Sequence, residues 1–321
     1  MRLPLHDERL VDKKVHEKKI GDKQHLRNPH LQDLKDLEQK IRDYCPLDYC
    51  TYDVVRFSRP YFKEFSYTEM FGGILVSPAS SEIAVQLSEF GLNQSVPVND
   101  FEHLEKFLQD RLDSQGSLDK YSLKKSPSFN SVDRIVFLPG SNLFPEMVSK
   151  EILARLLWEN PDVLAKFHPF TNEGTIRAIC ADFGYDRFID GNESGWHYLK
   201  NAKEVWSTSA SEMGLYAVLF GIPLKNVGNF FTEHKGAFYP VFKFVADKPI
   251  EVAQRTLKHL LASPYSGFFI PSDPNVDEKI QKYFKKAMEL REFHKPSIFE
   301  AYNLQMVPVH PEQSGRPIPS K

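Results

Sequence analysis

The sequence predicts an α/β protein whose second half is built on a parallel β-sheet with helices on both faces. Between residues 134 and 227, short apolar runs alternate with longer stretches of helical period, which is the pattern of consecutive βαβ units. Polar motifs follow several of these runs, where the carboxyl ends of parallel strands would meet. With 321 residues, of which 41% are hydrophobic, the chain can bury a substantial core in one large domain or two.

Residues 1–44 are expected to form a polar arm that leads into an amphipathic helix. The first 30 residues mix acidic and basic groups, and Leu31, Leu34, Leu37 and Ile41 then recur at helical spacing. Because the two signs of charge are interleaved throughout, we favour a helix packed on the body of the protein over an arm that binds nucleic acid.

Residues 45–125 are expected to form a smaller N-terminal α/β domain. Apolar runs at 53–57 and 72–76 are typical of strands, and the second precedes a helix that continues through Leu87 and Phe90. A further helix is expected at 101–112. The Ser- and Lys-rich stretch 114–130 is typical of an exposed connection, so the domain boundary is placed there.

Residues 130–303 are expected to form a Rossmann-like domain with C-terminal helices, followed by a flexible tail at 304–321. The predicted strands are 135–138, 163–167, 187–189, 204–206 and 223–227, and the predicted helices between them are 146–158, 173–183, 195–201 and 211–220. Two more helices, 250–261 and 277–293, could cross back onto the first domain.

Composition excludes several classes of protein. A net charge of -2 does not give the strongly positive field of a protein that acts mainly on nucleic acid, although a local basic patch is compatible with it. No signal peptide and no apolar run long enough for a transmembrane helix is found, so we expect a cytoplasmic location. The three cysteines, Cys45, Cys50 and Cys180, lack the spacing of a zinc site.

Two polar motifs follow predicted strands. Gly140 and Ser141 lie between a strand and a helix, so their backbone amides could bind an anion or a sugar, although an ordinary turn has the same composition. Lys166 and His168 alternate at the end of the next strand, which predicts that both side chains emerge on one face. A Lys or His at this point can neutralise a diphosphate or protonate a leaving phosphate oxygen.

A third motif is rich in hydroxyl groups. Ser207, Thr208, Ser209 and Ser211 occupy four of the five positions 207–211, where a predicted strand ends and the next helix begins, and Glu212 follows them. One hydroxyl would be enough for an N-cap, so we favour ligand binding by this run. The sequence contains no nucleotide-binding glycine motif, no nucleophile elbow and no Asp-x-Asp, and the last absence argues against a transferase that holds its nucleotide through a metal.

These segments resemble the GT-B-type glycosyltransferases of bacterial capsule polysaccharide synthesis, which are related in pattern to bacterial sialyl- and Kdo-transferases. The matching stretches are 166–169, 208–223 and 228–231, so the resemblance covers about residues 134–240. It implies a GT-B-like architecture in which His168, Ser209 and Ser211 contact the donor phosphate. Tyr216 stands where the family usually has Glu, and Glu212 stands at a place often held by Ser or Thr.

The leading hypothesis is a metal-independent glycosyltransferase, without a cofactor, that moves a sugar from a nucleotide-sugar donor to a polymer acceptor. The acceptor would be a surface glycan or a hydroxylated base in DNA, bound on the side of residues 45–125. Catalysis would use His168 and an acidic base, for which Glu82 and Asp53 are candidates by position. The donor set is Lys166, Gly140, Ser141, Ser207, Thr208, Ser209, Ser211 and Glu212.

Two other functions are compatible with the same residues. A nucleotide-sugar epimerase or hydrolase uses a similar fold and phosphate site, because a fold does not determine the reaction. A non-catalytic module that binds a nucleotide sugar would explain the missing Glu at Tyr216.

Overall fold

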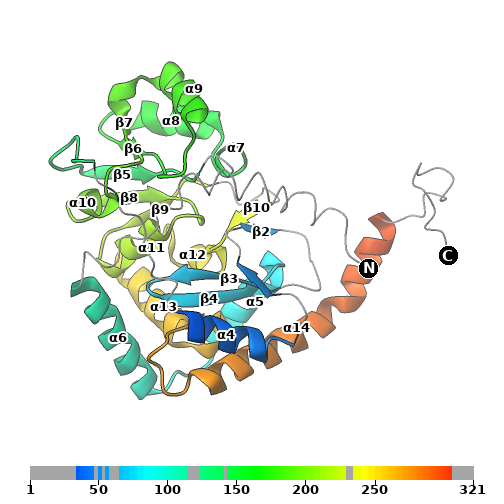
Figure 1. Cartoon of the computed structure of the whole chain (residues 1–321). Coiled ribbons are helices and arrows are strands. Elements are labelled where there is room, and N and C mark those ends of the chain that lie inside the picture. The colour runs from blue at the N-terminus through cyan, green and yellow to red at the C-terminus, as the bar shows by residue number, and fades with distance from the viewer. Residues whose placement is uncertain are drawn as a thin grey trace.

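The structure, a computed structural model, describes residues 34–46, 50–52, 55–57, 65–113, 123, 125–140, 143–228 and 234–305. Two sheets lie one above the other in Figure 1, with helices between them and around them. The predicted polar arm up to residue 33, Asp53, Ser141 and the predicted tail from residue 306 onward lie outside the described residues.

The second half of the chain contains the expected parallel sheet. Its strands are β5 (Arg134–Phe137), β6 (Leu164–Lys166), β7 (Phe188–Ile189), β8 (Glu204–Ser207) and β9 (Leu224–Asn226). They lie in the order β7-β6-β5-β8-β9, and every pair is parallel. The chain therefore starts in the middle of the sheet, builds outward to β7, and returns to build the other side from β8, which is the Rossmann-like order.

Helices cover both faces of this sheet (Figure 1). The helices are α7 (Phe144–Met147), α8 (Lys150–Glu159), α9 (Glu173–Phe183), α10 (Gly195–Leu199) and α11 (Glu212–Leu219), with the short 3-10 helix η2 (Tyr185–Arg187) before β7. Val136 packs into one core with residues of α7, α8 and α9. Its neighbours Ile135 and Phe137 pack into a second core with residues of α10 and α11. Successive side chains of this buried strand thus pack against helices on opposite faces of the sheet.

The predicted helix 146–158 is in fact two helices. Ser149 interrupts it, because its hydroxyl accepts a hydrogen bond from the amide of Ile152 at 3.2 Å and caps α8. The helix 173–183 begins and ends where it was expected, because Asn172 accepts from the amide of Thr175 at 2.8 Å and Gly184 follows with a φ of 81°.

The first sheet has four strands and is mostly antiparallel. Its strands are β1 (Cys50–Tyr52), β3 (Phe65–Met70), β4 (Gly73–Pro78) and β11 (Phe268–Phe269), in the order β1-β3-β4-β11, and only β1 and β3 are parallel. Strand β3 was not predicted. Phe71 and Gly72, with φ values of 53° and 77°, form the tight turn that joins β3 to β4.

Helices from both ends of the chain pack on the first sheet. They are α4 (Lys35–Tyr44), α5 (Ser81–Leu92), α6 (Val98–Asp113), α12 (Tyr239–Val245), α13 (Ile250–Ala262) and α14 (Val276–Gln305), with η3 (Pro264–Ser266) before β11. Phe65 and Tyr67 on one face pack with α4 and α14. The last two helices were counted with the second domain but were expected to be able to cross back onto the first, and they do so, because β11 between them pairs with β4.

A small third sheet joins the two halves of the chain. Strand β10 (His234–Gly236) pairs antiparallel with β2 (Val55–Phe57). One hydrophobic cluster also contains Met70 and Leu75 of the first sheet together with Val205 and Leu215 of the second half. No helix in the described part of the chain is long and apolar enough to cross a membrane.

Candidate functional site

The carboxyl edge of the five-stranded sheet collects most of the residues that the sequence analysis selected. Gly140 follows β5, His168 follows β6, and Thr208 follows β8. The direction of strand succession reverses between β5 and β8, and open α/β sheets bind ligands in front of this reversal. The loops of Gly140 and Thr208 therefore flank the point where a ligand is expected, and His168 lies one strand away.

Gly140 shapes the loop after β5. It is buried, and its carbonyl accepts hydrogen bonds from the amides of Leu143 at 2.9 Å and Phe144 at 3.0 Å. The carbonyl of Gly140 thus accepts from amides at the start of α7.

His168 is a titratable group at this edge, and its side chain is partly exposed. Its Nδ1 accepts a hydrogen bond from the amide of Phe170 at 3.1 Å, and the ring is half-buried. An amide can only donate, so the proton of the neutral ring is on Nε2. Nε2 is therefore the atom that can donate to a phosphate oxygen.

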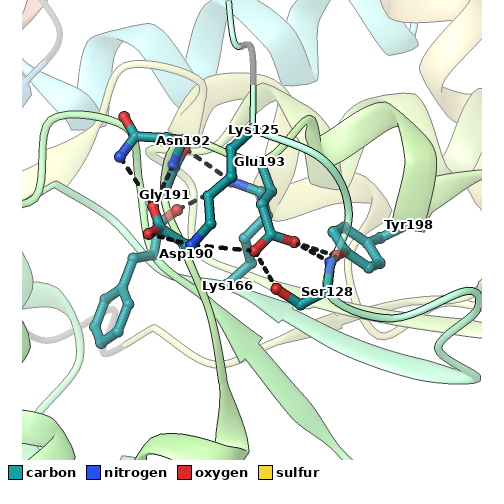
Figure 2. Close-up of polar contacts among 9 residues, drawn as sticks. Lys125, Ser128, Lys166, Asp190, Gly191, Asn192, Glu193 and Tyr198 are labelled. Atoms are coloured by element: carbon teal, nitrogen blue, oxygen red, sulfur yellow. Dashed lines mark hydrogen bonds and ion pairs between the residues drawn. The ribbon is translucent and has the colours of Figure 1, made fainter.

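Lys166 is the last residue of β6, so the strand alternation on which a shared face with His168 was predicted does not continue to His168. The side chain is 3% exposed, and its Nζ donates to the carbonyls of Phe167 and Gly191, each at 3.2 Å (Figure 2). A Cβ on Gly191 would lie 2.6 Å from the carbonyl oxygen of His168. Lys166 therefore holds the loop after β7 closely against the loop that carries His168.

The hydroxyl run after β8 is mostly turned inward. Ser207 donates to the carbonyl of Thr208 at 2.9 Å, Thr208 accepts from the amide of Ala210 at 3.3 Å, and Ser209 accepts from the amide of Gly236 at 3.2 Å. Ser207, Thr208 and Ser209 are at most 1% exposed. These hydroxyls shape the loop.

Ser211 differs from the rest of the run. It stands at the N-cap of α11, its side chain makes no capping hydrogen bond, and it is partly exposed. The hydroxyl of Ser211 therefore does not cap the amides in the first turn of α11. These amides lie at the carboxyl edge of the sheet, and the helix macrodipole favours an anion there.

Glu212 points toward the first sheet. Its Oε1 accepts a hydrogen bond from the amide of Phe71 at 2.6 Å, in the turn between β3 and β4. Nearby, Tyr216 is 4% exposed and packs edge-on against Phe71 and Trp196. Burial, and next the charge of Glu212, raise the pKa of Tyr216 well above its ordinary value. Tyr216 is thus a core residue.

A buried carboxylate that was not predicted from the sequence lies beyond β7. Glu193 is 0% exposed and accepts hydrogen bonds from the amide of Ser128 at 2.8 Å, from the hydroxyl of Ser128 at 2.6 Å, and from the hydroxyl of Tyr198 (Figure 2). Lys125 lies 3.8 Å away and also pairs with Asp190 at 2.8 Å. Burial raises the pKa of Glu193, but these hydrogen bonds outweigh it and hold the pKa below its usual value.

This cluster fixes the connection between the two halves of the chain. Residues 125–128, part of the connection expected to be exposed, are exposed, and Glu193 also binds Ser128 at the edge of the sheet. In the sequence, Glu193 lies in a polar Asp-Gly-Asn-Glu turn, which resembles an ordinary surface turn. No local signal distinguishes it.

Glu82, a candidate for the catalytic base, lies on a different surface. It is exposed on the first turn of α5 and lines a groove of about 390 Å³, whose opposite wall carries Lys235, Tyr239 and Lys243. Lys235 is 7% exposed; burial, and next the charge of Lys243, lower its pKa. Strand β10 connects this groove to the edge, because Gly236 contacts the backbone of Ser209.

These observations define a class: an α/β protein with a doubly wound parallel sheet and polar loops at its carboxyl edge. Within the described residues, no group of three or more His, Cys, Asp or Glu could hold a metal ion. No protein-family model matches the sequence. A comparison with curated proteins also finds no match.

Proposed function

We propose that the protein is a glycosyltransferase of GT-B-like organisation that binds a nucleotide sugar at the carboxyl edge of the five-stranded sheet. The observation that carries this proposal is the reversal of strand order between β5 and β8, with the loops of Gly140 and Thr208 on either side and His168 beside them. A diphosphate placed there would face Nε2 of His168 and the first-turn amides of α11.

The proposed reaction is a direct displacement at the anomeric carbon. A base on the side of the first sheet takes the proton of the acceptor hydroxyl, whose oxygen forms the new glycosidic bond while the bond to the donor phosphate breaks. His168 then donates from Nε2 to the leaving phosphate oxygen. Glu82, the candidate base among the described residues, lines a groove on a different surface from His168, so the proposal leaves the base unassigned. The proposal requires no metal.

The first test is thermal stabilisation by CMP, UDP, GDP and their sugars. A nucleotide at about 100 times its Kd should stabilise the fold by roughly 2.7 kcal/mol. This stabilisation should be lost in His168→Ala and kept in His103→Ala. His103 lies on α6, which does not belong to the half of the chain that forms the five-stranded sheet, so it serves as the matched control. If no nucleotide stabilises the protein, or if both variants respond alike, the proposed donor site is wrong.

The acceptor is tested separately. Incubation of the identified donor with surface glycan or with DNA containing hydroxylated bases should transfer sugar to one of them. A gel shift of duplex DNA that weakens as salt rises would favour DNA, since phosphate contacts release counterions. Consumption of the donor without any acceptor would instead identify an epimerase or hydrolase.

A non-catalytic module is the second candidate. It is favoured by Glu212, whose carboxylate binds the turn of Phe71 instead of lying at the edge, and by the core position of Tyr216. Stabilisation by one nucleotide sugar, with no turnover in the presence of either acceptor, is the result that this candidate predicts.

A further inference from the structure

One wall of the groove between α5 and α12 carries acidic side chains, and the other wall carries basic side chains. The wall formed by α5 carries Glu82, Gln86 and Glu89 at helical spacing, together with Ser81. The opposite wall carries Lys235 from β10, and Tyr239 and Lys243 one turn apart on α12. The two helices pack together in the space next to the first sheet (Figure 1). At about 390 Å³ the groove can hold a small ligand or one unit of a polymer.

The charged side chains that line the groove differ in how deeply they are buried. Lys235 is 7% exposed, and its Nζ lies 5.2 Å from the ring centroid of Tyr239. Glu82 and Glu89 are exposed, so water screens their charges. A charge in the partly dehydrated interior interacts much more strongly than one at the rim. The groove therefore has one basic group in its inner part, Lys235, and a second at its rim, Lys243.

We propose that this groove binds a phosphate group between Lys235 and Lys243. An anion there offsets both effects that lower the pKa of Lys235, which are its burial and the nearby charge of Lys243. Ser81 and Gln86 can donate hydrogen bonds to the remaining oxygens. The site is separate from the edge site around His168, and it does not depend on the proposed transfer reaction.

Pyridoxal phosphate is a suitable probe, because it combines a phosphate with an aldehyde. The amine of a lysine condenses with the aldehyde and releases water, and borohydride then reduces the imine to a stable secondary amine. Because its pKa is lowered, Lys235 has a larger unprotonated fraction than an ordinary lysine at the same pH. Peptide mass spectrometry of the full chain then measures labelling at each lysine.

We expect Lys235 to be labelled at least tenfold faster than Lys203, an exposed lysine paired with Asp133 on the other half of the protein. Inorganic pyrophosphate should slow labelling of Lys235 at least fivefold and leave Lys203 unchanged. The protection should persist in His168→Ala, which separates this site from the proposed donor site.

Lys243→Gln supplies the second measurement. Lys243 is exposed, so its replacement should not disturb folding. We expect about tenfold more pyrophosphate to be needed for the same protection of Lys235. Each of three results would overturn the proposal. The first is labelling of Lys235 no faster than that of Lys203, and the second is pyrophosphate protection that is equal at both lysines or absent. The third is an unchanged pyrophosphate concentration for protection in Lys243→Gln.

Discussion

At the scale of single residues, the buried polar groups of this protein mainly hold loops in place. Glu193 binds Ser128 through two hydrogen bonds, and Lys166 binds two backbone carbonyls. Both side chains lie at the edge where the donor is proposed to bind. Their contribution to function would therefore be to position the neighbouring loops, and their contribution to stability can be measured directly.

We predict that Glu193→Gln lowers the free energy of unfolding by about 2 to 3 kcal/mol at pH 7, because it replaces a buried carboxylate that accepts three hydrogen bonds. The pKa of Glu193 is lowered in the folded protein. Its contribution is therefore fully present above the unfolded pKa of about 4.3 and is lost as pH falls through the lower folded pKa. Urea unfolding from pH 7 to pH 3 measures both.

The control for this prediction is Glu173→Gln. Glu173 forms an exposed pair with Arg177 on α9, and its side chain is 82% exposed, so its replacement should change stability by less than about 0.5 kcal/mol. An equal effect of the two substitutions, or a difference between wild type and Glu193→Gln that grows at low pH, would contradict the role assigned to Glu193.

At the scale of elements, β10 packs closely against the loop after β8, which carries Thr208 and Ser209. A Cβ on Gly236 would lie 2.1 Å from the backbone nitrogen of Ala210. We predict that Gly236→Ala costs about 3 kcal/mol or more and also removes nucleotide stabilisation, because β10 must move away from Ser209. Thermal unfolding with and without the nucleotide measures both effects.

Gly174→Ala is the matched control. A Cβ there meets only the side chain of Asn172, at 3.4 Å, and the position lies in α9. Helix propensity favours Ala over Gly by up to about 1 kcal/mol, so the change should be neutral or stabilising. If Gly236→Ala behaves as mildly, the close approach of β10 to the loop is not required for folding.

The sequence was sufficient for elements whose signals are local. The alternation of strands and helices from β5 to β9 was predicted, and α9 was placed correctly because Asn172 and Gly184 mark its ends. Strand β3 was missed, because all of its positions are buried and polar Ser66, Thr68 and Glu69 interrupt the apolar pattern.

The details of the candidate site were less accessible, because they depend on contacts between distant segments. The inward direction of Ser209 depends on Gly236, and the direction of Glu212 depends on Phe71. A hydroxyl run at a helix start looks the same whether it binds a ligand or a neighbouring strand. The prediction that these residues bind the donor stays a prediction.

At the scale of the whole molecule, the two sheets share a core through the turn of Phe71. This residue is 0% exposed, packs edge-on against Tyr216, and belongs to the same cluster as Leu215 of α11. The amide of Phe71 also donates to Glu212 at the start of that helix. Two halves that share a core in this way should unfold together.

We predict that Phe71→Ala destabilises the whole chain by about 3 to 5 kcal/mol, because it opens a cavity between the sheets. The melting temperature should fall by roughly 6 °C or more. Far-ultraviolet circular dichroism reports both sheets, while Trp196, which packs on Tyr216, reports the second half by fluorescence. The two melting curves should coincide in wild type and should shift together in the variant. Phe293→Ala, at a side chain that is 76% exposed, should leave both unchanged. If the fluorescence transition stays in place while circular dichroism loses amplitude at lower temperature, the two halves fold independently and the shared core does not couple them.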